Sequence, residues 1–179
     1  KACHFVSGKF TEEDDGKIDY IRPSDQKKII QIPNASEKLV DETVQKAKKA
    51  FKDPSWSSIS PRDRAKLMYK WADLIEADVE ELSKIESMNS TRMITETSAG
   101  DVFATANTIR YFAGWTDKVD GQTTATSPNV LSLTLKEPYG VVVGIIPWNF
   151  PIAQTAWKAA PAIAAGNVVI IKPSEYTPL

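Results

Sequence analysis

The sequence is poor in the two side chains that most often perform nucleophilic and metal chemistry, since its 179 residues include one cysteine and one histidine. A single cysteine excludes an internal disulfide framework and a cysteine-based zinc site. Cys3 and His4 are adjacent, and neighbours in an extended strand point to opposite faces, so they do not form a nucleophile pair. We therefore expect both residues to be bystanders and predict no metal site.

The sequence also lacks an excess of either charge. Lys plus Arg number 22 and Asp plus Glu number 23. Without a basic excess we expect no nucleic-acid partner, and without an apolar run of roughly 20 residues we expect no membrane partner. We expect the cytoplasm as the compartment, with the mitochondrial matrix as the alternative, because a transit peptide would already be missing from a chain that starts at Lys1.

What is present is an ordinary globular composition, 42% apolar and 25% charged. Short strand-like pieces at 4–6, 18–21 and 29–32 come first, separated by turn residues that include the stretch Asp14–Gly16. Ser36 and Ser60 are each placed to cap a helix, and a third helix is predicted over about 95–115. The apolar stripe of the second helix is expected to be Leu67, Met68, Trp71, Leu74, Ile75, Leu82 and Ile85, and the inward residues of the third Val102, Phe103, Ala106, Ile109 and Ala113.

After Gly121 the pattern changes from helical to strand-like. Leu131, Leu133 and Leu135 alternate with polar residues, which predicts a strand over 130–136 with one apolar face. The run 141–146 is apolar throughout, as expected for a strand covered on both faces, and 168–171 is a second such run. A helix over about 152–165, closed by Gly166, lies between them, so the order is strand, helix, strand, which forms a right-handed βαβ unit.

Two unusual loops follow the two apolar strands, at residues 147–150 and 172–175. Ligands of open α/β sheets bind beyond the carboxyl ends of the strands, so we expect these loops to lie side by side at a site. The Gly-x-Gly-x-x-Gly and Gly-x-x-x-x-Gly-Lys phosphate motifs are absent. Lys172 and Glu175 offer an ammonium donor and a carboxylate acceptor suited to a sugar diol; a solvated ion pair is the alternative that the residues alone leave open.

Several motifs, in order, resemble the aldehyde dehydrogenase superfamily. Residues 137–179, EPYGVVVGIIPWNFPIAQTAWKAAPAIAAGNVVIIKPSEYTPL, match its E-P-x-G-V-V strand, P-W-N-[FY]-P loop, W-K-x-x-P-A-L-A-x-G-N helix and K-P-x-E-x-T-P turn. The likeness extends upstream through RYFAGWTDKVDGQT (110–123), RDRAKLMYKWADLIE (62–76) and, more loosely, FVSGKF (5–10). It covers essentially the whole chain.

The resemblance implies an α/β fold in which N-terminal helices and a β-strand arm lead into the first βαβ unit of a Rossmann-like parallel sheet. The implied divisions are an N-terminal β-meander with helices over 1–121, an oligomerisation arm over 122–138, and the start of a cofactor-binding domain over 139–179. In relatives the arm packs against a neighbouring subunit, so the resemblance implies a homodimer or homotetramer.

The resemblance also assigns roles residue by residue. Asn149 would donate its side-chain amide to the aldehyde oxygen as negative charge develops there, and its alternative is a turn-forming residue. Lys172 and Glu175 would hold the adenosine ribose of NAD, and NADP is disfavoured because Glu175 would repel a 2′-phosphate. The cofactor groove would be lined by Ile146, Pro147 and Trp148, and the aldehyde tunnel by Phe150, Gln154 and Trp157. For Trp157, plain core packing is the alternative.

Two departures from the family pattern stand out. Many relatives have an Asn-Gly-Lys-Pro turn where this chain reads NSTRM at 89–93, which we expect to alter that loop and to leave the site untouched. The family's nucleophilic cysteine and general-base glutamate are expected downstream of this chain. We therefore expect the 179 residues of this chain, on their own, to be inactive. The alternative to the N-terminal segment of an enzyme is a truncated, non-catalytic relative that acts as a binding or assembly module.

Overall fold

A computed structural model describes residues 3–13 and 15–179. Its N-terminal part consists of two antiparallel hairpins, β1 (His4–Val6) with β2 (Lys9–Thr11) and β3 (Lys17–Ile21) with β4 (Lys28–Pro33). The three strands expected from the sequence are confirmed within one residue at each end, and β2 is additional. Asp14, part of the turn expected at 14–16, lies outside the described residues. Tyr20 of β3 is fully buried, and its hydroxyl donates to the carbonyl of Met88 at 3.0 Å, which fixes the second hairpin against the helices.

Four helices follow, and two of them have the expected caps. The four are α1 (Glu37–Lys52), α2 (Pro54–Ser57), α3 (Pro61–Ala77) and α4 (Val79–Ser90). The hydroxyl of Ser36 accepts from the Leu39 N–H at the start of α1, and that of Ser60 from the Asp63 N–H at the start of α3.

The expected continuous apolar stripe is wrong in part. The helix breaks at Asp78 between α3 and α4, so the residues after the break follow a new helix axis. Leu67 is 54% and Leu74 56% exposed, because α3 packs on its neighbours through Met68 and Ala72 instead.

The third helix is not one uniform α-helix. It is built from α5 (Ile94–Glu96), the π-helical turn η1 (Thr97–Asp101) and α6 (Val102–Ala113). The wide turn buries Thr97, whose hydroxyl donates to the carbonyl of Ser83 at 3.0 Å. Of the five residues expected to point inward, Val102, Ala106, Ile109 and Ala113 are buried, but Phe103 is 39% exposed, so that expectation was wrong for Phe103.

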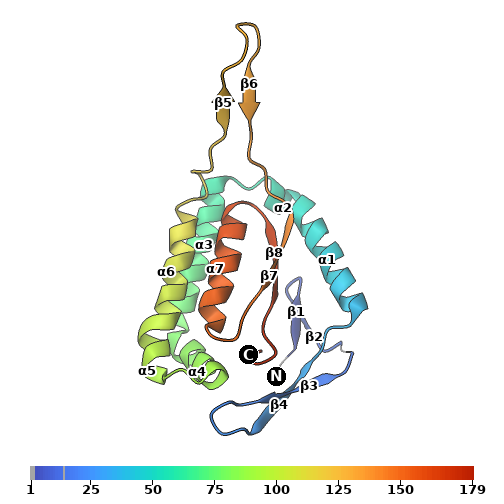
Figure 1. Ribbon diagram of the computed structural model, residues 1–179, viewed down its shortest axis with the longest axis vertical. Coiled ribbons are helices and arrows are strands. Elements are labelled where there is room, and N and C mark those ends of the chain that lie inside the picture. The colour runs from blue at the N-terminus through green and yellow to red at the C-terminus, as the bar shows by residue number, and fades with distance from the viewer. Residues whose placement is uncertain (1–2, 14) are drawn as a thin grey trace.

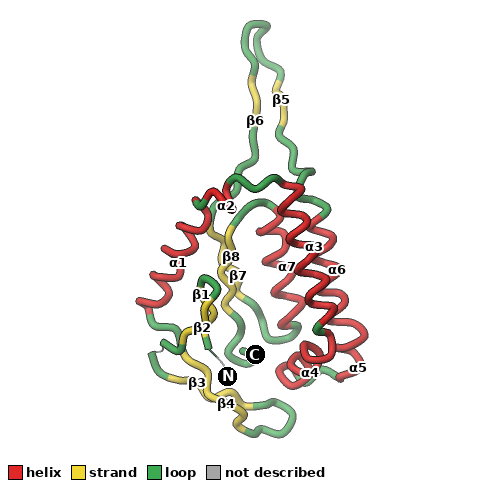
Figure 2. The backbone as a smooth tube through the Cα atoms, turned by 180° about the vertical axis from the view of Figure 1, so that it is seen from behind, coloured by secondary structure: helices red, strands yellow, loops and turns green. Residues whose placement is uncertain are grey.

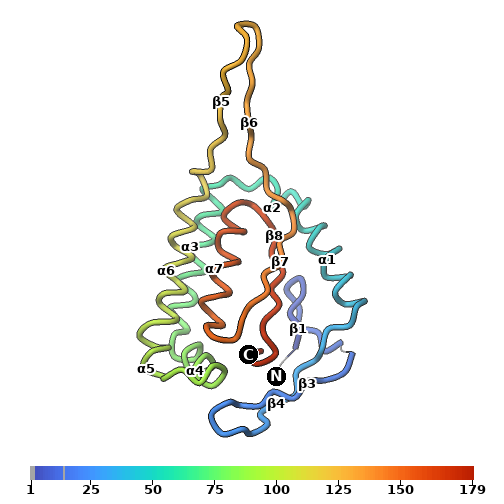
Figure 3. The backbone as a smooth tube through the Cα atoms, viewed as in Figure 1, coloured from blue at the N-terminus to red at the C-terminus, as the bar shows by residue number. Residues whose placement is uncertain are grey.

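A long hairpin arm separates the helices from the βαβ unit. The chain leaves α6, runs out along β5 (Gln122–Thr124), and returns along β6 (Ser132–Thr134), as Figures 1 and 3 show. Seen from behind in Figure 2, the arm projects well away from the rest of the chain. The strand is shorter than the predicted 130–136, and Leu131, Leu133 and Leu135 are all exposed.

The chain ends in the expected βαβ unit, in which β7 (Val141–Ile145) and β8 (Val168–Lys172) are parallel and joined by α7 (Pro151–Ala164). Gly166, with φ +91°, ends α7 in a conformation that other residues rarely adopt. The expectation that the strands are covered on both faces was wrong for β7, because Val143 is 55% and Ile145 68% exposed. In β8, residues 168–171 are all partly buried, and both α1 and α7 contact this strand.

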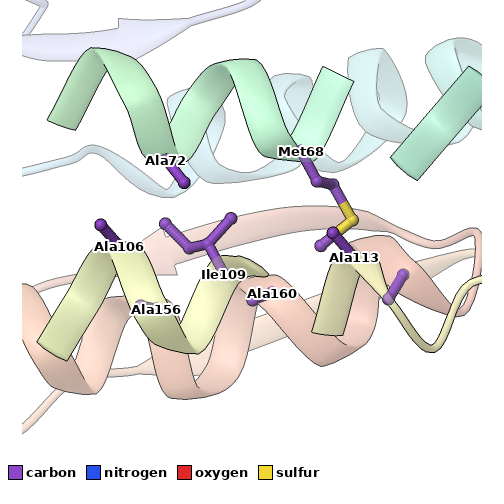
Figure 4. Packing of buried hydrophobic residues seen from close by; sticks show 8 residues of the cluster. Met68, Ala72, Ala106, Ile109, Ala113, Ala156 and Ala160 are labelled. Atoms are coloured by element: carbon purple, nitrogen blue, oxygen red, sulfur yellow. The ribbon is translucent and has the colours of Figure 1, made fainter. Parts of the chain in front are cut away.

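The main core lies where α3, α6 and α7 meet. Figure 4 shows Met68 and Ala72 of α3 facing Ala106, Ile109 and Ala113 of α6, with Ala156 and Ala160 of α7 against them. Ala156, Ala160 and Ala164 recur every four residues on α7, and their small side chains let the helices pack closely. This packing fixes α7, and therefore the loop that leads into it.

Candidate functional site

The two unusual loops begin side by side at the carboxyl ends of β7 and β8, as expected. Ile145 is in register with Lys172, and the Ile146 N–H donates to the carbonyl of Lys172 at 3.0 Å. At the other end of the pair, the side-chain oxygen of Asn167 accepts from the Gly140 N–H at 3.0 Å and its amide donates to the carbonyl of Ala162 at 3.0 Å. Asn167 therefore fixes the register that brings the two loops together.

Lys172 and Glu175 form the first part of the site. The Nζ atom of Lys172 lies 3.3 Å from Oε2 of Glu175, and the two side chains are 59% and 50% exposed. The pKa of Glu175 is lowered, first by its own backbone N–H and then by Lys172, so the carboxylate is ionised at neutral pH. The pair presents a cation and an anion to solvent, a geometry that suits a diol and equally a solvated ion pair.

The loop after β7 forms the second part of the site. Ile146 is buried, whereas Pro147, Trp148 and Asn149 are exposed. At the start of α7 the Gln154 N–H donates to the carbonyl of Phe150, and the Ile152 N–H donates to the carboxylate of Glu86. The Asn149 side chain takes no part in either, so these contacts leave its amide exposed.

Phe150, Gln154 and Trp157 share one face of the start of α7, because they are separated by four and three residues. Gln154 is half-buried, and its side-chain oxygen accepts from Nζ of Lys158 at 2.8 Å. Trp157 is 50% exposed, so the alternative of plain core packing is wrong within this chain. This face presents aromatic and amide groups beside the Asn149 loop.

Glu86 of α4 is part of the site that the sequence did not reveal. Its side chain is 3% exposed, and both carboxylate oxygens lie 3.3 Å from the Ile152 N–H. Burial raises the pKa of Glu86 to about 7; the Ile152 N–H and Arg92 lower it, while Asp101 raises it further. Ser83, Glu86 and Asn89 are polar residues at three-residue spacing on α4, and all three are buried in the fold, although residues of these types usually lie in solvent.

Arg92, in the loop after α4, also contacts the site. Its guanidinium carbon lies 4.3 Å from the centre of the Phe150 ring, and its Nε donates to Asp101 at 2.6 Å. The expectation that the variant loop 89–93 leaves the site untouched was therefore wrong. Thr91 in this loop has φ +59°, which places the next residue, Arg92, at the turn out of α4.

No group of three or more His, Cys, Asp or Glu side chains is arranged to hold a metal ion within the residues described. Over the same residues, no helix combines the length and apolar character needed to cross a membrane.

The comparisons with known proteins agree with one another. Residues 10–179 match the model of the aldehyde dehydrogenase family. An aldehyde dehydrogenase of Aspergillus niger is 44% identical over 176 residues, which cover 98% of this chain and 35% of that protein. The mitochondrial 10-formyltetrahydrofolate dehydrogenase of Homo sapiens is 43% identical over 180 residues, which cover 98% of this chain and 20% of that protein.

Solved structures give the same result. PnpE in complex with nicotinamide adenine dinucleotide is 41% identical with a TM-score of 0.92, covering 99% of this chain and 36% of that one. The aldehyde dehydrogenase KauB of Pseudomonas aeruginosa is 34% identical with a TM-score of 0.94, covering 100% of this chain and 36% of that one. The chain thus spans about a third of the length of the aldehyde dehydrogenases it matches.

Proposed function

The chain belongs to the aldehyde dehydrogenase family, and on that premise we propose that it is the N-terminal region of an enzyme that oxidises an aldehyde to a carboxylic acid with NAD as hydride acceptor. One observation carries this proposal: the exposed Asn149 and the pair Lys172–Glu175 follow two parallel strands whose ends are in register. Ligands of α/β sheets bind at this edge, so one groove can present both groups to a cofactor and a substrate.

The residues present fit the adenosine end of NAD. The ammonium of Lys172 can donate to a ribose hydroxyl, and the ionised carboxylate of Glu175 can accept from one. Ile146, Pro147 and Trp148 would line the groove at the end of β7 with backbone and apolar surface. When bound, NAD supplies the hydride acceptor, whereas the protein supplies position and electrostatics.

Asn149 acts on the substrate in this proposal. Its side-chain amide donates to the aldehyde oxygen as a nucleophile from another part of the enzyme attacks the carbonyl carbon and negative charge moves onto that oxygen. A donor that is already in place costs no reorganisation at that moment, and a comparable donor contributes about 3 to 4 kcal/mol. Phe150, Gln154 and Trp157 would form part of the wall along which the aldehyde reaches this amide.

The arm has a separate role in assembly. Leu131 is 77% and Leu135 80% exposed on a two-stranded hairpin that projects away from the helices and from the βαβ unit (Figure 1). Apolar side chains on such a projection favour association with another chain. We infer that the arm contributes to a homodimer or homotetramer.

The proposal is tested by assaying the full-length protein for NADH formation with a panel of aldehydes. Aldehyde-dependent reduction of NAD, together with a carboxylic acid product in equal amount, supports it. A protein that binds NAD but forms neither product would instead be a binding or assembly module and would refute the enzymatic proposal.

A further inference from the structure

The loop that carries Asn149 leads into α7, whose first turn is hydrogen-bonded to the carboxylate of Glu86 from α4. Glu86 lies 66 residues before Ile152 in the sequence, yet both of its oxygens accept from the Ile152 N–H. Ile152 is the second residue of α7, and Pro151, the first, has no N–H to donate. The residue at the N-cap, Phe150, makes no side-chain cap hydrogen bond. Glu86 therefore performs the capping that α7 lacks locally.

The buried position of Glu86 suits this task. A carboxylate is favoured at the positive end of a helix, and removal from water strengthens that interaction. The charged groups that bear on Glu86 are Arg92, from the loop after α4, and Asp101, from η1; these two pair with each other at 2.6 Å. Arg92 also contacts the Phe150 ring, so the loop is held on both sides of Pro151.

We propose that Glu86 is a positioning residue, whose carboxylate fixes the start of α7 and thereby the direction in which the preceding loop presents the Asn149 amide. The inference rests on the proposed role of Asn149 and extends it to a residue that touches neither substrate nor cofactor. Asn149 precedes Ile152 by three residues, with the Pro151 ring limiting rotation between them. A shift at the α7 N-terminus is therefore transmitted to Asn149.

The positioning of the Asn149 loop by Glu86 should depend on pH. Because the pKa of Glu86 is about 7, the group changes from a neutral acid to a carboxylate across the physiological range. The carboxylate accepts the Ile152 N–H more strongly than the acid does. Positioning of the loop is therefore expected to improve as pH rises through about 7.

The test compares Glu86→Ala, Glu86→Gln and Asn149→Ala in the full-length enzyme, with Glu80→Gln as the control. Glu80 is on the same helix, but it is exposed and pairs with Lys84. Glu86→Ala should lower kcat about tenfold, since a misplacement of ~1 Å can cost up to about 100-fold. In the Asn149→Ala background the same change should cost less than about twofold, because the two residues act through one interaction.

Two further readouts separate positioning from mere stability. Hydrogen exchange at the Ile152 amide should accelerate at least about tenfold in Glu86→Ala, because the capping acceptor is lost. The ratio of wild-type to Glu86→Gln kcat should be near one below pH 6 and rise through about pH 7, since the amide keeps an acceptor oxygen but does not ionise. Other groups that titrate in this range affect both enzymes equally, so their effect on kcat cancels in the ratio. If Glu86→Ala fails to fold, this ratio still tests the positioning role of Glu86.

The two proposals fail in different ways. If Asn149→Ala loses activity but the Glu86 variants keep wild-type kcat, hydrogen exchange and pH dependence, the oxyanion role stands and the positioning inference is overturned. If Asn149→Ala retains wild-type kcat, the oxyanion role itself fails, and the positioning inference falls with it. A loss in Glu86→Ala that persists undiminished in the Asn149→Ala background also overturns the inference, because Glu86 would then act independently of Asn149.

Discussion

Nζ of Lys172 and Oε2 of Glu175 lie 3.3 Å apart just beyond the end of β8, on side chains that are both about half exposed. A ribose with two free hydroxyls can replace water at this pair, whereas a 2′-phosphate would bring its negative charge against Glu175. The full-length enzyme should therefore show a higher kcat/KM with NAD than with NADP. Glu175→Gln removes the repulsion, so the ratio of kcat/KM with NAD to kcat/KM with NADP should fall at least about tenfold, or roughly 1.4 kcal/mol.

Steady-state kinetics with both cofactors checks this expectation, and Glu13→Gln, an exposed carboxylate in the N-terminal region, provides a matched control. An NADP efficiency equal to that with NAD, or a ratio that Glu175→Gln leaves unchanged, would return the pair to a solvated ion pair without a role in cofactor choice.

The buried carboxylate of Glu86 should make stability depend on pH. Its pKa is about 7 in the fold against an ordinary value of 4.5, so the unfolded chain ionises first. The contribution of this group to stability is therefore greatest below about pH 4.5, decreases between about 4.5 and 7, and stays low above that range. Glu86→Gln should unfold like the wild type near pH 5 and be more stable at pH 8, by at most about 3 kcal/mol.

Urea denaturation of the full-length protein at several pH values measures the difference. Glu80→Gln should show no such trend between pH 5 and 8, since the pKa of Glu80 is lowered by Lys84 and the group is already ionised throughout. If the free energies of unfolding of Glu86→Gln and the wild type differ by the same amount at every pH from 5 to 8, Glu86 does not titrate in this range.

The arm should determine assembly. Leu131→Glu combined with Leu135→Glu places charge on the two most exposed leucines of the hairpin, and we expect the resulting protein to dissociate into smaller species. Lys136→Glu also adds negative charge to this segment but removes no apolar contact, so it should assemble normally. Sedimentation at tens of micromolar, roughly above common contact affinities, distinguishes these cases; an unchanged oligomer in the double variant would refute the role of the arm.

The βαβ unit could be predicted from sequence because its signals are local. Two apolar runs mark the strands, Pro151 begins α7, and Gly166 ends it with a positive φ. The π-helical turn of η1 had no such signal, since it depends on packing of Thr97 against Ser83. The exposure of Val143 and Ile145 was likewise missed, because an apolar run indicates a strand that needs cover but not whether the chain itself supplies that cover.

Part of the candidate site could likewise be predicted from the sequence, and part of it could not. The adjacency of the 147–150 and 172–175 loops follows from parallel strand pairing, which is a general rule of the fold class. Glu86 and Arg92 were missed because charged residues on a helix or in a loop are usually solvated. Their contacts to Ile152 and Phe150 join segments that are about 60 residues apart, and no local pattern encodes those contacts.

The central claim is that Asn149 stabilises the developing charge on the aldehyde oxygen, and Asn149→Ala in the full-length enzyme tests it most directly. The kcat for aldehyde oxidation should fall about 100- to 1,000-fold while the Kd for NAD stays nearly unchanged, because the proposal assigns the ribose to Lys172 and Glu175 and not to Asn149. Asn149→Asp should be worse, since it places an acceptor anion against the developing charge. A fall in kcat of less than about fivefold, roughly 1 kcal/mol, or a loss confined to NAD binding, would contradict the claim and leave Asn149 as a turn-forming residue.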